Sequence, residues 1–273
     1  MDNVIKQIDE SVKFIRSKTS FVPEVAVVLG SGLGDVLDDI DLELAIPYAE
    51  IPNFPVSTVI GHSGKLLLGI WNTKKVIVMS GRFHYYEGYS LQQVTFPIRV
   101  MKMLGAKTIF ITNASGGLNP EIKVGELMII DDHINFNSDH PLRGKNDEKL
   151  GPRFPDQHRV YDLSLIEKAQ SIARDQNIPL HRGVYIGVTG PTFETPAEYR
   201  FFRLIGGDAV GMSTVPEVIV ANHMGMRIFC NTVITDEGNP PIPQKVTHEE
   251  VVRAAREAEP RMKSLLNELL LHT

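Results

Sequence analysis

The chain has 273 residues but only one cysteine and one tryptophan. A single cysteine excludes an internal disulfide and any zinc cluster built from cysteine ligands. Cys230 lies in the apolar run Met226–Val233, so we expect a buried side chain that behaves as a small hydrophobe. The chemistry of this protein must therefore come from other residue types.

Long apolar runs and basic runs are also missing. No stretch approaches the roughly 18 apolar residues that a membrane-spanning helix needs, so we predict no membrane association. The net charge is −5 and lysine and arginine do not cluster, which argues against a nucleic-acid-binding surface. The first 18 residues predict an amphipathic helix without the apolar core of a signal peptide, and we expect a cytoplasmic protein.

What is present is a regular alternation of apolar strands and helices. Hydrophobic residues make up 42% of the chain and charged residues 22%, as in globular domains. Strands are predicted at Val25–Leu29, Leu66–Trp71, Val76–Met79, Thr108–Thr112, Leu127–Ile130, Gly183–Thr189, Ala209–Met212 and Arg227–Ile234. We predict one α/β domain over residues 1–273, with a central, mixed, largely parallel sheet flanked by helices.

The segments between these strands carry helix and loop signals. Helices are expected at Leu91–Leu104, Leu163–Asp175, Pro196–Leu204, Val215–Met224 and Thr247–Leu271. Pro97 should kink the first of them or start a second segment. Thr247 and Glu250 form a capping box at the start of the last one. The polar stretch from Asn135 to Asp162 is a long loop of the kind that is usually functional or mobile.

Four loops follow predicted strands and are rich in glycine or in polar side chains. They are Gly30–Gly34, Gly81–Tyr89, Asn113–Gly117 and Gly190–Thr195. Ligands of open α/β sheets bind where loops leave the carboxyl ends of strands, so we expect these loops to meet at one site. The first is a poor dinucleotide fingerprint, because its third glycine comes one residue early for GxGxxG, and it lacks the lysine of a P-loop. It could hold an anion or be only a tight turn.

The loop after Val76–Met79 concentrates the most chemistry. Arg82 and His84 are two residues apart, so in extended backbone both side chains point the same way. A planar guanidinium and an imidazole make a good clamp for a phosphate dianion. The alternative is an ordinary polar loop with a few stacked aromatic rings. His62, in Gly61–Gly64, is a further candidate for the same oxyanion pocket, although a lone histidine in a turn is more often only solvated.

The loop Gly190–Thr195 predicts a different kind of ligand. It places the aromatic face of Phe193 beside the carboxylate of Glu194, which suits stacking on a planar heterocycle and accepting from its N–H edge. The alternative is a helix N-terminus at which Glu194 merely favours the dipole. No histidine spacing such as HExxH occurs, so we predict no metal. The residues alone therefore indicate a pocket for phosphate and a planar ligand.

Six segments together closely resemble a known family. In chain order they read VVLGSGLG, VIGHSGKL, GRFHYYEGY, TNASGGLNP, GPTFETPAE and DAVGMSTVPEVIVA. They are similar to motifs of the trimeric purine nucleoside phosphorylases, and the likeness runs from Val25 to His248. The resemblance implies phosphorolysis in purine salvage: a purine nucleoside and phosphate become the free base and ribose 1-phosphate, with phosphate as co-substrate and no cofactor.

The resemblance also implies roles for individual residues. Phosphate is expected at Ser31, His62, Arg82, His84, the backbone N–H of Ala114, and Ser213. The nucleoside is expected at Tyr86, Phe154, Phe193, Glu194, Val210, Met212, Asp236 and His248. Of all these, His84, Glu194, Asp236 and His248 are the expected catalytic residues. Phe154 matches a residue that a neighbouring subunit places over the sugar, so the resemblance implies a homotrimer with shared sites. Glu87 has no catalytic role in this likeness.

One residue departs from the family pattern. Where members specific for 6-oxopurines have asparagine, the alignment gives Asp236, and the loop from there to His248 is about two residues shorter. An ionised aspartate cannot donate to the purine N7 or O6 atom, whereas a protonated one can. Either burial near Glu194 and phosphate keeps Asp236 protonated, or the enzyme prefers 6-aminopurines. The third interpretation is a solvent-facing loop residue.

Three rival functions follow from the same residues. A methylthioadenosine phosphorylase is the nearest, but Glu194 after Phe193 and His248 before Glu249 suit a nucleoside with a free 5′-hydroxyl. A non-catalytic nucleoside-binding module would not need both a phosphate clamp and a base clamp. A dinucleotide dehydrogenase is disfavoured by the glycine spacing.

Overall fold

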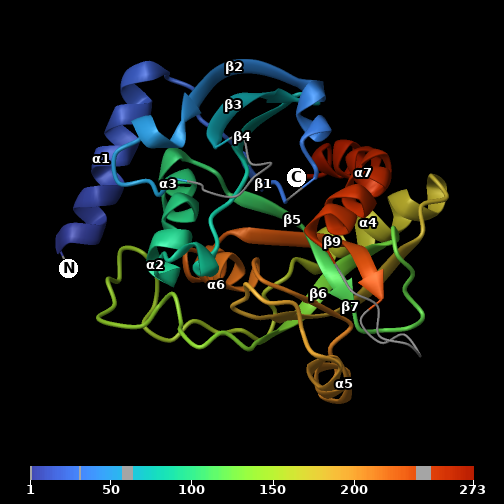
Figure 1. Cartoon of the computed structure of the whole chain (residues 1–273). Coiled ribbons are helices and arrows are strands. Elements are labelled where there is room, and N and C mark those ends of the chain that lie inside the picture. The colour runs from blue at the N-terminus through green and yellow to red at the C-terminus, as the bar shows by residue number, and fades with distance from the viewer. Residues whose placement is uncertain (1, 31, 57–63, 238–246) are drawn as a thin grey trace.

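The fold is built on one nine-stranded sheet (Figure 1). The computed structural model describes residues 2–30, 32–56, 64–237 and 247–273. The strands are β1 (Val25–Val28), β2 (Ile40–Pro47), β3 (Lys65–Trp71), β4 (Lys74–Ser80), β5 (Thr108–Gly117), β6 (Leu127–Asn135), β7 (Leu180–Gly187), β8 (Ala209–Gly211) and β9 (Arg227–Glu237). Their order is β2-β3-β4-β1-β5-β8-β7-β6-β9. Strand β9 also pairs with β5, so β5, β8, β7, β6 and β9 close into a ring.

The sheet is mixed, as predicted. Strands β4, β1, β5 and β9 run parallel to one another, so their carboxyl ends meet at one edge. Strand β7 is parallel to both β6 and β8. The pairs β2–β3, β3–β4, β5–β8 and β6–β9 are antiparallel. The predicted hairpin between β3 and β4 is present, with Asn72 and Thr73 in the left-handed region that such turns require.

Helices cover the sheet on both faces (Figure 1). One layer contains α1 (Asp2–Lys18), α2 (Leu91–Val94), α3 (Phe96–Leu104) and α6 (Val215–His223). The other contains α4 (Leu163–Asp175) and α7 (His248–Leu270), and α7 packs on β9 and β5. Helix α5 (Pro196–Leu204) lies apart from both layers. Helix α2 ends before Phe96 and Pro97 stands in the first turn of α3, which confirms the second of the two outcomes expected of this proline.

Most buried apolar side chains form one core between the sheet and these helices. The ends of its elements follow from local chemistry. Thr247 caps α7, accepting from the backbone N–H of Glu250 while the Glu250 carboxylate accepts from that of Thr247, as the capping box predicted. Cys230 is buried, as expected. Among the described residues, none of the helices is both long and apolar enough to cross a membrane.

Three parts of the sheet differ from the sequence-based expectations. Strand β2 was not predicted, because its outer face is mostly exposed and its pattern is weak. Asn113–Gly117 is not a loop after a strand but the second half of β5. Glycines there are required by close packing: a Cβ atom at Gly117 would lie 2.9 Å from the Ile234 side chain. Strand β9 likewise continues past Ile234, so Asp236 lies on a strand and not in a loop.

Asp162 joins the start of α4 to the start of β9, and its charge should be measurable in stability. Its Oδ1 accepts from the backbone N–H of Leu165 at 3.1 Å, and its Oδ2 accepts from Arg227 Nε at 2.6 Å. Burial pushes the pKa of this carboxyl up, but hydrogen bonds from Arg227, Ser164 and Leu165 outweigh burial and lower the pKa to about 2. The stabilisation is therefore present above the ordinary value of 3.8 and is lost as pH falls through about 2.

We expect Asp162→Asn to lower the free energy of unfolding by about 1–2 kcal/mol at neutral pH, allowing for solvent screening on the Arg227 side. Asparagine caps helices as well as aspartate, so the substitution removes the charge and keeps the cap. Urea unfolding followed by the fluorescence of Trp71 measures the difference. It should shrink between pH 4 and pH 2, and a deficit that does not change with pH would contradict the assignment.

Candidate active site

A cavity of about 380 Å³ lies at the edge where the parallel strands end. Gly30 after β1, Arg82 after β4, Ala114 on β5 and Asp236 on β9 all line it, as the strand-exit rule predicts. The predicted site residues that line it are Arg82, His84, Tyr86, Ala114, Phe193, Glu194, Val210, Met212, Ser213, Asp236 and His248. The fold thus brings together side chains that are up to 166 positions apart in the sequence.

Of the predicted site residues that the structure describes, Phe154 alone does not line the cavity. Phe154 lies in the long loop between β6 and α4 and is 86% exposed, and the guanidinium of Arg153 lies over its ring, 5.4 Å from the centroid. Ser31 and His62 lie outside the described residues. Of the long loop, residues 136–162 contain neither helix nor strand, as expected.

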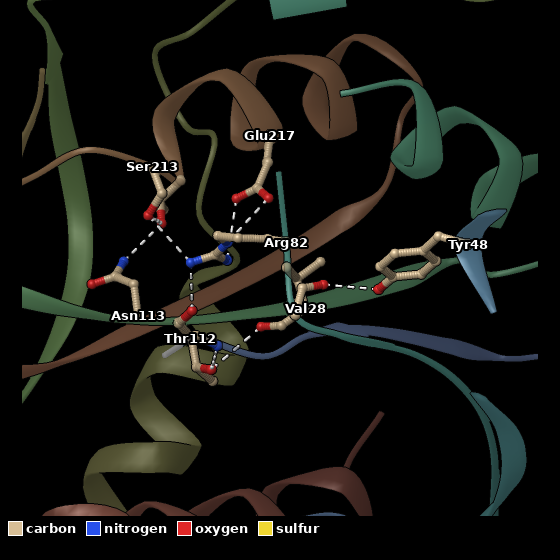
Figure 2. A network of polar contacts seen from close by, with 10 residues as sticks. Val28, Tyr48, Arg82, Thr112, Asn113, Ser213 and Glu217 are labelled. Atoms are coloured by element: carbon tan, nitrogen blue, oxygen red, sulfur yellow. Dashed lines mark hydrogen bonds and ion pairs between the residues drawn. The ribbon is translucent and has the colours of Figure 1, made fainter. Parts of the chain in front are cut away.

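Arg82 lines the cavity and is almost completely buried. Figure 2 shows the polar contacts of its guanidinium. Its guanidinium pairs with the Glu217 carboxylate, with Nε donating to Oε1 at 3.3 Å and Nη2 lying 3.2 Å from Oε2. Its Nη1 donates to the Thr112 carbonyl at 2.8 Å and to Ser213 Oγ at 3.2 Å. The arginine is therefore held in one orientation by β5, by α6 and by the turn before α6.

The turn that carries Ser213 contains a strained backbone conformation of the kind found at functional sites. Thr214 has φ of +70°, which a β-branched residue rarely adopts. Asn113 Nδ2 donates to its hydroxyl at 2.7 Å, and this contact helps to fix the turn. Helix α6 begins at the next residue, so its N-terminal partial positive charge lies beside Ser213. Strained backbone of this kind is concentrated at functional sites, where the surrounding contacts hold it.

His84 is the second side chain at this end of the cavity. Its Nδ1 lies 3.1 Å from Glu87 Oε1, and the same oxygen accepts from the His84 backbone N–H at 2.8 Å. The imidazole stacks on the ring of Tyr86, with 4.7 Å between centroids. Glu87 thus orients the histidine, which is a structural use for a residue without a predicted catalytic role. Burial raises the pKa of Tyr86 to about 12, so its hydroxyl stays protonated.

The opposite end of the cavity holds two carboxyls and an aromatic ring. Glu194 and Phe193 follow β7 through Gly190, whose φ of +63° favours glycine. Burial raises the pKa of Glu194, and the negative charges of Asp236 and Glu198 add to the effect. Burial also raises the pKa of Asp236, against hydrogen bonds from Thr235 and Tyr199. Asp236 is half-buried on β9 and lines the cavity, so it is not the solvent-facing loop residue of the third interpretation.

Two residues of the site were missed from the sequence. Glu217 lies inside a helical, apolar segment, where a single glutamate gives no sign that it pairs with an arginine 135 positions away. Tyr199 lies on α5, and its hydroxyl reaches Asp236 Oδ2 at 3.4 Å. Tyr199 lies four residues after Thr195, about one helical turn. That spacing is the one sequence signal that could have placed Tyr199 near the neighbouring Glu194. Over the described part of the chain, no group of three or more histidine, cysteine, aspartate or glutamate side chains could hold a metal ion.

Comparison with known proteins agrees with this geometry. The family model described as Phosphorylase superfamily matches residues 24–271. Purine nucleoside phosphorylase 1 of Bacillus subtilis is 51% identical over 246 residues, which cover 90% of this chain and 91% of that protein. The purine nucleoside phosphorylase of Bos taurus is 45% identical over 268 residues, 96% of this chain and 93% of its own.

The chain belongs to the purine nucleoside phosphorylase family. A crystal structure of the Schistosoma purine nucleoside phosphorylase in complex with hypoxanthine has the same fold, with a TM-score of 0.92 and 39% identity over 97% of this chain and 96% of that one. The predicted family, fold and enzyme class, a glycosyl-transferring purine nucleoside phosphorylase, are confirmed. These relatives do not favour the methylthioadenosine or adenosine-preferring alternatives.

The ion pair between Arg82 and Glu217 gives a test of how the site is held. Replacing Glu217 with alanine leaves a buried guanidinium without its counter-charge, which should lower the free energy of unfolding by about 3–5 kcal/mol. Glu10→Ala is the control, since the Lys6–Glu10 pair is exposed and should contribute no more than about 0.5 kcal/mol. Denaturant unfolding of both variants makes the comparison, and equal effects would contradict a dominant role for the buried pair.

Proposed function

We propose that this cavity catalyses the phosphorolysis of purine nucleosides of the inosine and guanosine type, giving the free base and ribose 1-phosphate. The observation that carries the proposal is the polarity of the cavity. Arg82, His84, Ser213, Phe193, Glu194 and Asp236 all line it. Arg82 donates to the Thr112 carbonyl on β5 and to Ser213, whereas Asp236 pairs with Gly116, four residues farther along β5, or roughly 13 Å at the usual rise of a strand. A nucleoside placed between the two ends has its anomeric carbon next to the phosphate end and its base at the carboxyl end.

The phosphate end suits a dianion. Arg82 and Ser213 are hydrogen-bonded to each other, and the N-terminus of α6 adds a partial positive charge beside them. We assign His84, Ser31, His62 and the backbone N–H of Ala114 to the same phosphate. Tyr86, Val210, Met212 and His248 are assigned to the ribose, with His248 at the 5′-hydroxyl.

The base end explains the choice of substrate. An ionised Glu194 accepts from the N1–H group of a 6-oxopurine and, in guanine, from the 2-amino group as well, and Phe193 covers the ring. Asp236 serves this base only when protonated, as a donor to N7 or O6. The raised pKa of Asp236, which results mainly from burial, favours that state, and a phosphate dianion bound in the same cavity would raise the pKa further. An ionised Asp236 would instead accept from a 6-amino group.

The chemistry needs charge stabilisation at two places. Breaking the glycosidic bond builds positive charge on the ribosyl ring and negative charge on the departing purine. The phosphate dianion stabilises the ring and attacks C1′, and the donor at N7 or O6 stabilises the purine. Removing one such preorganised group typically lowers kcat by about 10²–10³. We propose that the enzyme works without a metal or an organic cofactor, in the cytoplasm, as one domain over residues 1–273.

Phosphate-dependent release of hypoxanthine from inosine tests the proposal. Arg82→Lys keeps the charge and loses the planar fork, so kcat/KM for phosphate should fall about 10²–10³-fold. Inosine, guanosine, adenosine and methylthioadenosine should be compared across pH. Faster release of adenine from methylthioadenosine than of hypoxanthine from inosine would overturn the choice of substrate. An inosine rate that stays high and flat well above neutral pH would rule out a catalytic protonated Asp236.

We further propose a homotrimer in which each Phe154 covers the sugar site of a neighbour. An 86% exposed phenylalanine in a long loop is explained if a partner chain buries it. In a cyclic trimer the same contact repeats around the ring, so every site is completed by the next subunit. This accounts for both the exposure of the ring and the retention of a loop that has no secondary structure.

Mixing two inactive variants tests the shared site. Phe154→Ala damages the site of the neighbour, whereas His84→Ala damages the site of its own chain. Co-refolded in equal amounts, the two should restore about a quarter of the wild-type sites, because a site is intact when its own subunit carries Phe154→Ala and its neighbour carries His84→Ala. Sedimentation measures the oligomer. A trimer that gains no activity on mixing, or a fully active monomer, would contradict sharing.

A further inference from the structure

A second cavity, of about 560 Å³, lies outside the catalytic site. Helices α1, α2 and α3 and the long loop between β6 and α4 contribute to its lining, and none of the described residues that line it also lines the catalytic cavity. Its volume is in the range of small-molecule sites. The proposed phosphorolysis makes no use of this second cavity, so its chemistry needs a separate explanation.

Arg99 is the group in the second cavity that most needs a partner. It projects from α3, lines the cavity and has an exposed fraction of only 8%. Within the described part of the chain its side chain makes one hydrogen bond, from Nη1 to His223 Nδ1 over a long 3.5 Å, and no ion pair. Burial, with no opposing charge, lowers the pKa of Arg99 to about 10. A buried guanidinium without a counter-charge is costly, and the adjoining cavity has room for one.

His223 orients Arg99 but does not balance its charge. It is the last residue of α6, is buried and lines the same cavity. Its Nδ1 accepts from Arg99, and its Nε2 lies 3.2 Å from Asn146 Oδ1, which assigns the proton of a neutral ring to Nε2. Burial, and then the charge of Arg99, lowers the pKa of His223, which favours the neutral ring.

The other charged groups of the lining leave an excess of positive charge. Arg143 and Lys145 are both exposed, and the Arg143 guanidinium pairs with Asp139 at 3.1 Å. Asp147 is the single acidic side chain among the described lining residues, and its Oδ1 accepts from the backbone N–H of Lys149 at 3.0 Å. The second cavity therefore suits an anion.

The walls of the second cavity are apolar and aromatic near the helices. Phe54 and Phe96 both line it, with their rings edge to face and their centroids 5.9 Å apart. Leu142 and Leu150, from the long loop, add further apolar surface. Such walls favour a ligand with a flat, apolar body over a bare inorganic ion.

We propose that the second cavity is a binding site for a small organic carboxylate, whose head pairs with the Arg99 guanidinium and whose flat, apolar body lies against Phe54 and Phe96. The planar fork of an arginine matches a carboxylate. A phosphate dianion is the poorer match, because Arg99 is the one buried cation among the described lining residues. The inference is independent of the proposed function, since the two cavities have no described lining residue in common.

4-Bromobenzoate is a suitable probe, because it joins a carboxylate to a flat ring and its bromine can be located by anomalous scattering. We expect titration calorimetry to detect its binding to the wild-type protein. The uncharged 4-bromobenzamide has nearly the same shape and should bind at least about tenfold more weakly, since it cannot pair with a guanidinium. Crystals soaked with 4-bromobenzoate should show the bromine in the second cavity.

Arg99→Met and Arg143→Ala are the matched variants. Arg99→Met keeps an apolar side chain and removes the charge, so the affinity for 4-bromobenzoate should fall about 10–100-fold. Arg143→Ala removes an exposed arginine of the same cavity that already has a partner, so the affinity should change less than about fivefold. As a second readout, the probe should raise the Tm of the wild type and of Arg143→Ala but not that of Arg99→Met.

Three results would overturn the proposal. Equal binding of 4-bromobenzoate and 4-bromobenzamide to the wild type would show that no cation serves the site, and this comparison decides the matter even if Arg99→Met does not fold. Bromine found only in the cavity beside Arg82, or bound only at crystal concentrations, would leave the second cavity without this ligand. A crystal structure in which a neighbouring chain places a carboxylate on Arg99 would replace the ligand with a subunit contact.

Discussion

The buried ion pair between Arg82 and Glu217 is the interaction on which the site depends. Arg82 lies two residues after the end of β4, and Glu217 lies in the first turn of α6. The pair thus joins a strand end of the sheet to a helix that packs on it. A buried guanidinium is tolerated only when its donors are met, and here a carboxylate, a carbonyl and a hydroxyl meet them. The same contacts fix Ser213 and the N-terminus of α6, so the protein itself holds in place the end of the cavity that we assign to phosphate.

The end of the cavity that we assign to the base carries carboxyl groups in place of a guanidinium. Glu194 and Asp236 both line the cavity and are half-buried, and burial raises the pKa of each. The charge of Asp236 raises the pKa of Glu194 further, so the two carboxyls resist being ionised together. A cavity with Arg82 at one end and such carboxyls at the other can stabilise opposite charges as they separate. This separation of charge is the event that cleavage of a glycosidic bond requires.

The order of the strands makes this arrangement possible. Strands β4, β1, β5 and β9 are parallel, so residues that follow them are delivered to one edge although they come from distant parts of the chain. The Phe193–Glu194 loop follows β7, which belongs to the ring of strands β5, β8, β7, β6 and β9, and it lines the same cavity. Gly117 lets β5 and β9 approach closely, and Gly190 takes the left-handed conformation that the turn after β7 needs.

The sequence by itself determined the elements and the two kinds of ligand chemistry. Apolar runs placed most strands, Pro97 and Thr247 placed helix starts, and Arg82, His84, Phe193 and Glu194 indicated phosphate and a planar base, because each depends on residues that are close together along the chain. Strand ends and long-range pairs could not be read in this way. Asn113–Gly117 became a strand only because β8 and β9 supply its hydrogen bonds.

The tertiary structure alone decided which polar side chains form ion pairs and hydrogen bonds with each other. Glu217 and Tyr199 are ordinary members of helices until the fold brings them to Arg82 and Asp236. Burial, which no local pattern specifies, raises the pKa of Asp236 and so decides what an aspartate in place of asparagine can do. Pairing and desolvation arise from contacts between distant segments. For that reason the sequence indicated the type of chemistry but not the side-chain pairs and pKa shifts that adjust it.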